Sequence, residues 1–149
     1  MARTRAHGRR LRRTAGRHRR RVRRPLRLLL DTHAALWWLS DDARLTTEAV
    51  QRLTDSSNRV LLSAAVVWEV AIKRSLGRLD APGAFAQTLL GAGAVALPVT
   101  LAHAEAVESL PWHHHDPFDR MLVAQATVEG AVLLSGDEAL RAYDVPIVW

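Results

Sequence analysis

The chain has 149 residues, which is enough for one domain with its own hydrophobic core. It contains no cysteine, which excludes disulfides, zinc–thiolate sites and thiol catalysis, and no apolar run is long enough to span a membrane. The net charge of +6 hides an uneven distribution: residues 1–24 contain twelve arginines and no acid, so the rest of the chain carries nine basic against 15 acidic residues, a balance of −6.

The arginine-rich segment 1–24 is predicted to be a disordered arm, because its composition cannot bury a core. It lacks the apolar stretch of a secretory signal. Three interpretations stay open. The arm could bind nucleic acid through phosphate contacts, it could be an amphipathic or transit-like leader, although it contains little serine, or it could be upstream sequence translated from a misassigned start. In the last case the protein would begin near Val22 or Leu26.

Short apolar runs alternate with helical patterns through residues 26–149, the predicted folded domain. The predicted strands are Leu26–Leu30, Arg59–Leu62, Val95–Val99, Ala131–Leu134 and Pro146–Val148. The predicted helices are Ala34–Leu39, Thr46–Asp55, Ser63–Leu76, Pro82–Leu90, Leu101–Ser109, Pro117–Gly130 and Asp137–Tyr143. This alternation predicts a three-layer α/β/α sandwich around a mostly parallel sheet.

Two of the predicted strands run directly into an acid. Asp31 follows the first strand, and Asp137 follows the strand that ends at Leu134. Ligands of open parallel sheets bind beyond the carboxyl ends of the strands, which makes both acids candidates for a site. Either could instead cap the helix that follows; capping is the better explanation for Asp137 and an equally good one for Asp31.

Three further acids lie on predicted helices. Glu69 sits in a helix that is apolar nearly all round, so it is expected to face a polar cleft, although an exposed pair with Lys73 is the simpler alternative. Asp116 and Asp119 have the spacing of a capping box. In that arrangement Asp116 caps the helix and Asp119 can turn toward the cleft.

A carboxylate beside a core element is costly unless it is solvated, capped or paired with a cation. Three or four such acids in one small chain indicate a shared cation, and an all-oxygen site favours Mg²⁺ or Mn²⁺ over zinc. The three consecutive histidines at 113–115 are interpreted as solvated or substrate-facing, without a metal role. His33 could orient Asp31, contact phosphate or simply pack at the start of a helix.

Four segments together resemble the PIN-domain ribonucleases, and within them the VapC-type toxins of toxin–antitoxin pairs. They are LLLDTHAALWWL at 28–39, LLSAAVVWEVAIKRSLGRL at 61–79, HHHDPFDRMLVAQA at 113–126 and VLLSGDEALRAYDVPIVW at 132–149. The resemblance implies a PIN-like fold with acids around one or two divalent ions. Carried over, the metal-binding and catalytic acids are Asp31, Glu69, Asp119 and Asp137, with Asp116 as an extra acid ranked below Asp119.

The activity implied by the resemblance is an Mg²⁺- or Mn²⁺-dependent endoribonuclease that cleaves RNA with a metal-activated water. The implied partners are an RNA substrate, a cognate VapB-like antitoxin and a second copy of the chain, with Trp37 and Trp38 as candidate interface residues. A cytoplasmic location and no membrane association are expected. His33, Lys73 and Arg120 are candidate phosphate contacts.

Two other functions remain open at this stage. A haloacid-dehalogenase-type phosphohydrolase would also place an aspartate after its first strand, but it needs a second one two residues later, where this chain has His33. A non-enzymatic protein could instead bind nucleic acid through the basic arm.

Overall fold

A single five-stranded sheet organises the computed structural model, which describes residues 24–149. All neighbouring strands pair in parallel, in the order β3-β2-β1-β4-β5. Almost all of the predicted arm therefore lies outside the described residues, and so does its interpretation as sequence translated from a misassigned start. The strands are β1 (Arg27–Leu30), β2 (Arg59–Ser63), β3 (Val95–Leu97), β4 (Val132–Leu134) and β5 (Ile147–Val148).

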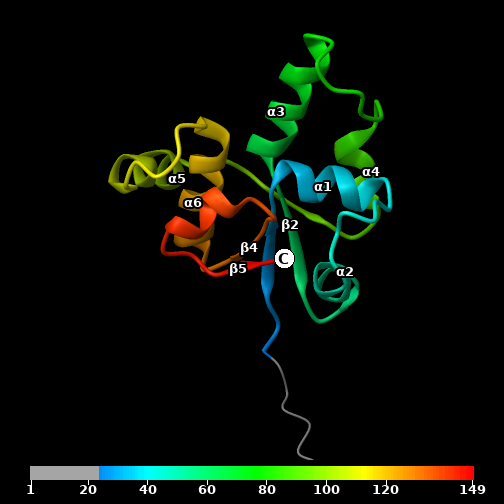
Figure 1. The fold of residues 1–149 in the computed structure, drawn as a ribbon, viewed down its shortest axis with the longest axis horizontal. Coiled ribbons are helices and arrows are strands. Elements are labelled where there is room, and N and C mark those ends of the chain that lie inside the picture. Colours follow the sequence, from blue (N-terminus) through cyan, green and yellow to red (C-terminus); the bar gives the residue numbers. More distant parts are fainter. Residues whose placement is uncertain (1–23) are drawn as a thin grey trace, which may run out of the picture.

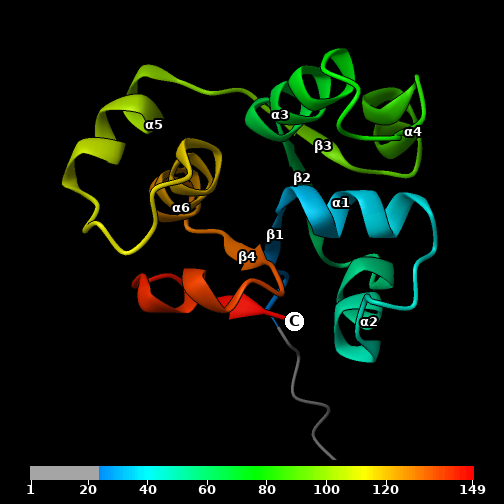
Figure 2. The same cartoon turned by 45° about the horizontal axis from the view of Figure 1, so that its top comes forward.

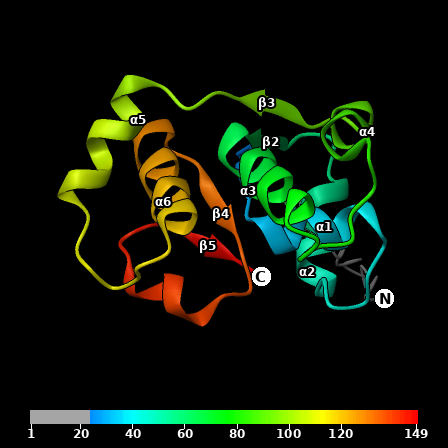
Figure 3. The same ribbon diagram turned by 90° about the horizontal axis from the view of Figure 1, so that it is seen from above.

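Helices cover the sheet on both sides, which confirms the predicted sandwich. Helices α5 and α6 lie on one side of the strands and α1, α2 and α4 on the other, with α3 at the carboxyl ends of the strands (Figures 1 and 2). Seen from above, α3 lies between α6 and α1 (Figure 3). The helices are α1 (Thr32–Leu39), α2 (Thr47–Thr54), α3 (Ala64–Ser75), α4 (Phe85–Gly91), α5 (Leu101–Ala106) and α6 (Pro117–Glu129), with 3₁₀ turns η1 (Val107–Ser109) and η2 (Glu138–Ala142).

The predicted boundaries are wrong at a few ends. Helix α1 begins at Thr32 rather than Ala34, because the Asp31 side chain caps it directly. Strand β3 ends at Leu97, before Pro98, which has no N–H for the ladder. The stretch predicted as one helix over 101–109 finishes as a 3₁₀ turn.

The remaining end corrections concern two short elements. Helix α4 begins at Phe85 rather than Pro82, and its first turn has no side-chain cap. The segment predicted as a helix after Asp137 is the 3₁₀ turn η2. The cap predicted at Asp116 is confirmed, and the side chains of Thr46 and Ser63 likewise accept a hydrogen bond from the first turn of the following helix.

The core lies along the central strands. Leu28, Leu29 and Leu30 of β1 are fully buried, as are Leu133 and Leu134 of β4. A strand of a parallel sheet covered by helices on both faces is buried on both faces, which explains why these runs are apolar without alternation. Within residues 24–149, no helix has the length and apolar character needed to cross a membrane.

A buried histidine ties α5 to the end of α6. His103 is fully buried; its Nδ1 accepts a hydrogen bond from the Thr100 backbone N–H (3.0 Å), and its Nε2 lies 2.8 Å from Glu129 Oε1. Arg27 at the start of β1 adds an ion pair to Glu129 (3.3 Å). The bond with His103, and then the bond and charge of Arg27, hold the pKa of Glu129 below its usual value.

This junction predicts a pH-dependent contribution to stability. A carboxyl whose pKa is lower in the folded state stabilises the fold above its unfolded pKa, and the contribution is lost as the pH falls through the folded value. Glu129→Gln should therefore lower the melting temperature at pH 7, and the deficit should shrink as the pH falls below about 4.5. Thermal melts from pH 3 to 7 measure this, with the exposed Glu105→Gln as the matched control. An unchanged deficit across the series would contradict the assignment.

Candidate metal centre

The pairing of β1 with β4 brings the two strand-end acids to one edge of the sheet. Leu30 is in register with Leu134, and the Asp31 backbone N–H donates to the Leu134 carbonyl (3.1 Å). Asp31 is only 5% exposed. Its Oδ1 accepts from the Ala34 N–H (2.7 Å), and its Oδ2 accepts from the Ser135 hydroxyl (2.5 Å). Asp31 is thus a helix cap and a member of the acid cluster at once.

Glu69 projects from α3 toward the same edge and is also 5% exposed. Its Oε1 accepts from the Thr32 hydroxyl (2.8 Å), and its Oε2 pairs with Lys73 Nζ (2.9 Å). The interpretation of this pair as exposed is wrong for the acid: the Glu69 side chain is buried, and only that of Lys73 is substantially exposed. The bond from Thr32 turns the Glu69 side chain toward the first residue of α1.

The first turn of α6 supplies two more acids with different tasks. Asp116 Oδ1 accepts from the N–H groups of Phe118 (2.8 Å) and Asp119 (3.1 Å), so it caps the helix. Asp119 instead points toward the loop before α6, where its Oδ2 lies 3.4 Å from His114 Nε2. That nitrogen is also 3.6 Å from Asp137 Oδ2.

His114, Asp119 and Asp137 form the tightest polar cluster. One potential ligand atom from each lies within 4.8 Å of the other two. Sequence reasoning interpreted the three histidines as solvated or substrate-facing and did not single out His114. Asp137 also caps η2 through its Oδ1, which accepts from the Ala139 N–H (2.9 Å). The capping explanation is therefore correct for Asp137 without removing it from the cluster, because Oδ2 faces the other acids.

The charges of these acids act on one another. Burial, and then the neighbouring charges of Asp116, Glu69 and Asp137, together raise the pKa of Asp119 to about 7, against the opposing effect of His114. Burial likewise raises the pKa of Asp31, against the hydrogen bonds from Ser135 and Ala34. The acids predicted from sequence therefore belong to one electrostatic site.

The Lys73 ammonium is a further member of this site. Its hydrogen bond to Glu69 raises its pKa, and the charges of Glu69, Asp116 and Asp119 act in the same direction. One lysine and one imidazole do not balance five carboxylates. This surplus of negative charge, carried on oxygen donors, fits a hard divalent cation such as Mg²⁺ or Mn²⁺.

Two hydroxyls that sequence reasoning missed orient the buried acids, Thr32 on Glu69 and Ser135 on Asp31. Thr32 directly follows Asp31 and Ser135 lies two residues before Asp137, and this closeness in the sequence is the signal that could have identified them. Ser135 also accepts from the Asp137 backbone N–H (3.1 Å), which links the two strand-end acids. Gly136 lies between Ser135 and Asp137. A Cβ there would approach the Trp149 indole to 2.6 Å, so the ring lies directly against this loop.

The predicted phosphate contacts differ in their surroundings. The Arg120 prediction is wrong: the residue is 3% exposed, and its guanidinium binds three backbone carbonyls and the Tyr143 hydroxyl. His33 is exposed and lies beside Trp37. The Trp37 and Trp38 side chains are packed against the core, which favours the packing explanation for both.

A protein-family model described as the PIN domain matches residues 28–146. The chain belongs to the PIN-domain family. Enzymes of this family are hydrolases that act on nucleic acids and generally use divalent metal ions. No curated protein matches the sequence significantly.

Solved structures share this PIN fold at low sequence identity. VapBC2 from Rickettsia felis, bound to a DNA fragment from its promoter, has a TM-score of 0.63 at 10% identity. The alignment covers 83% of this chain and 98% of the matched chain. DNA-bound VapBC from Salmonella typhimurium has a TM-score of 0.60 at 14% identity, with coverages of 83% and 97%. VapBC-1 from nontypeable Haemophilus influenzae has a TM-score of 0.56 at 17% identity, with the same coverages.

The raised pKa of Asp119 predicts that Asp119→Asn stabilises the metal-free protein but removes the stabilisation by Mn²⁺. Its folded pKa of about 7 exceeds the unfolded value near 3.8, so the metal-free fold loses stability as the pH rises between these values. Asp119→Asn should therefore raise the metal-free melting temperature at pH 8, by about 2–5 °C. It should also abolish the rise that Mn²⁺ produces in the parent protein. Differential scanning calorimetry with and without Mn²⁺ tests both; a parent and a variant that respond equally to Mn²⁺ would contradict the assignment.

Proposed function

We propose that this PIN-domain protein is a divalent-metal-dependent endoribonuclease and the toxin of a toxin–antitoxin pair. The nuclease part of the proposal rests on the cluster of buried and half-buried acids at the carboxyl edge of the sheet, whose surplus negative charge a divalent cation would neutralise. The toxin part is supported by the likeness in fold to proteins solved as VapBC complexes.

Each acid has a proposed role. Asp31, Glu69 and Asp119 would hold a first Mg²⁺ or Mn²⁺ directly or through water, Asp137 would complete that site or help hold a second ion, and Asp116 would contribute mainly as the cap of α6. Bound there, such an ion would activate water and stabilise the charge that develops on the phosphodiester. The Thr32 and Ser135 hydroxyls keep one oxygen each of Glu69 and Asp31 engaged, which fixes where the remaining lone pairs point.

Lys73 is the proposed contact for the RNA backbone. It is the cation of the cluster with a substantially exposed side chain, 44%, and its ammonium lies 2.9 Å from the Glu69 carboxylate. Because a bound ion would take over much of the charge of Glu69, the ammonium would be free to approach a phosphate at the same edge. Exposed His33 is a second proposed contact.

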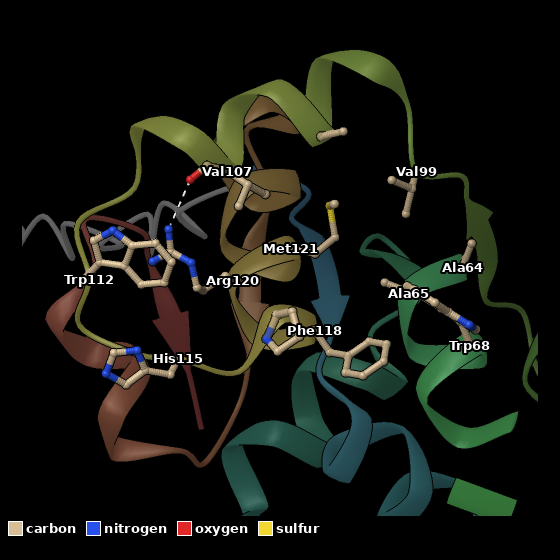
Figure 4. A pocket seen from close by; sticks show the side chains of 12 residues that line it. Ala64, Ala65, Trp68, Val99, Val107, Trp112, His115, Phe118, Arg120 and Met121 are labelled. Carbon is tan, nitrogen blue, oxygen red and sulfur yellow. Dashed lines mark hydrogen bonds between the residues drawn. The ribbon is translucent and has the colours of Figure 1, made fainter. Parts of the chain in front are cut away.

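The proposed partners are a VapB-like antitoxin and a second copy of the chain, in a cytoplasmic setting. An apolar hollow of about 620 Å³ between α3, α5 and α6 offers one surface for protein contact (Figure 4). Exposed apolar side chains line it: Trp68 is 63% exposed, Trp112 71% and Val99 40%. Such a surface is apolar enough for an interface between copies.

Single substitutions of the proposed ligands test the activity. Asp31→Asn and Asp119→Asn should each reduce Mn²⁺-dependent cleavage of a mixed single-stranded RNA by more than about 100-fold, because each removes a charge from the ion. Asp80→Asn, at an exposed acid outside the cluster, is the matched control. Cleavage at the parent rate by either cluster variant would refute the metal-site assignment. A parallel assay on DNA of the same sequence measures the preference for RNA.

Removal of residues 1–24 separates the nuclease from a protein that binds through its arm. The truncated protein should retain cleavage within about threefold, because every proposed ligand lies in the domain predicted over 26–149. A truncated protein that loses its activity while keeping its melting temperature would favour a functional role for the arm.

The proposed homodimer has its own test. Val99→Glu places a charge on a 40% exposed residue that lines the hollow, and it should shift the protein toward monomer in light scattering at micromolar concentration. Val128→Glu, at a 45% exposed position on α6 outside the lining of the hollow, is the matched control. A dimer that survives Val99→Glu unchanged would remove this surface from the proposal.

A further inference from the structure

The segment between η1 and α6 carries His114 to the acid cluster, and it contains no strand or helix of its own. A single side chain of α6 holds its beginning. The Arg120 guanidinium donates to the carbonyls of Pro111 (2.9 Å), Val107 (3.1 Å) and Leu110 (3.3 Å). Its charged carbon also lies 3.9 Å from the centre of the Trp112 ring (Figure 4). These contacts come from a residue that is almost fully buried.

Tyr143 continues this attachment toward His114. Its hydroxyl accepts hydrogen bonds from Arg120 Nη1 (3.1 Å) and from the His114 backbone N–H (3.0 Å). The side chain is 5% exposed and comes from the end of η2, the turn that Asp137 caps. One phenol oxygen therefore joins α6, the η2 turn and the loop that carries the histidine.

The hydrogen bonds of the His114 ring fix its orientation and its tautomer. Nδ1 accepts from the Asp116 backbone N–H (3.0 Å), so the neutral ring carries its hydrogen on Nε2. Nε2 is the atom that faces Asp119 Oδ2 and Asp137 Oδ2, at 3.4 and 3.6 Å. A nitrogen that bears a hydrogen has no lone pair for a metal, but it can donate to a carboxylate.

We infer that Arg120 and Tyr143 are positioning residues for the acid cluster, and that they hold His114 with its Nε2–H, rather than a lone pair, toward Asp119 and Asp137. The inference deepens the proposed function, on which its metal-binding consequence rests. Because this nitrogen lies within 3.6 Å of one oxygen of each acid, a displaced ring would change the surroundings of both carboxylates. Partners of this kind around a metal site typically change metal affinity by 10–100-fold when they are removed.

Tyr143→Phe is the most direct test, because it keeps the buried ring and removes only the oxygen. We expect Mn²⁺ affinity, measured by titration calorimetry without RNA, to fall by about tenfold. We also expect the ¹⁵N signals of the His114 ring to move in the metal-free protein. The matched control is Thr127→Val, which removes a hydroxyl bonded to the Val123 carbonyl two turns farther along α6. The inference is overturned if Tyr143→Phe leaves both readouts at the control values.

Arg120→Lys provides a second variant that keeps the charge and loses the planar fork. It should move the same His114 signals and weaken Mn²⁺ binding in the same direction. If its fold is lost, as judged by its thermal melt, the Tyr143→Phe result decides. Unchanged signals in a folded Arg120→Lys protein would contradict the role of the guanidinium.

Substitutions of His114 distinguish an N–H donor at this position from a metal ligand. His114→Gln retains an N–H group at a similar reach and should keep Mn²⁺ affinity within about threefold, whereas His114→Ala should lose about tenfold. Equal losses of 100-fold or more in both variants would identify His114 as a ligand and overturn the donor assignment. The ¹⁵N spectrum of the parent protein gives an independent answer, because a hydrogen on Nδ1 would also overturn it.

Different results would refute the proposed metal centre and the proposed role of Arg120 and Tyr143. A parent protein that binds no Mn²⁺ refutes the proposed metal centre. The metal-free spectra of the parent and of Tyr143→Phe still decide whether the phenol and the guanidinium fix the His114 ring.

Discussion

The parallel pairing of β1 with β4 is the constraint from which the rest of the site follows. It ends two adjacent central strands at the same edge of the sheet, so Asp31 and the loop to Asp137 lie side by side. Helix α3, which follows β2, and helix α6 then bring Glu69 and Asp119 to the same edge. A doubly covered parallel sheet leaves this edge as the place where polar groups can gather.

The acid cluster destabilises the fold that brings its members together. Buried carboxylates with raised pKa values are unfavourable neighbours, and the protein offsets them locally with hydroxyls from Thr32 and Ser135, the ammonium of Lys73 and the ring of His114. None of these donors is strong enough to neutralise the group, since Asp119 retains a pKa of about 7. Incomplete compensation is the physical property expected of a site prepared for a cation.

Local patterns were enough to predict the strands, the main helices and the five acids. The strands are short apolar runs, two of which, β1 and β4, lead to an acid. The cap residues Thr46, Ser63 and Asp116 mark helix starts by chemistry that depends only on neighbours. The positions of His114 and Arg120 could not be predicted in the same way. Both depend on the path of an irregular loop, which is set by contacts with Tyr143 more than twenty residues away. The charge of Arg120 suggested an exposed side chain that contacts phosphate, whereas its guanidinium contacts backbone carbonyls and the Trp112 indole.

The indole of Trp149, the residue after β5, lies directly against the loop between Ser135 and Asp137 because Gly136 has no side chain. The centre of the same ring lies 5.5 Å from that of Trp37 on α1. The indole therefore separates the loop that leads to Asp137 from the helix that Asp31 caps. Any residue larger than glycine at 136 would have to displace either this ring or the loop, so the placement of Asp137 depends on a position without a side chain.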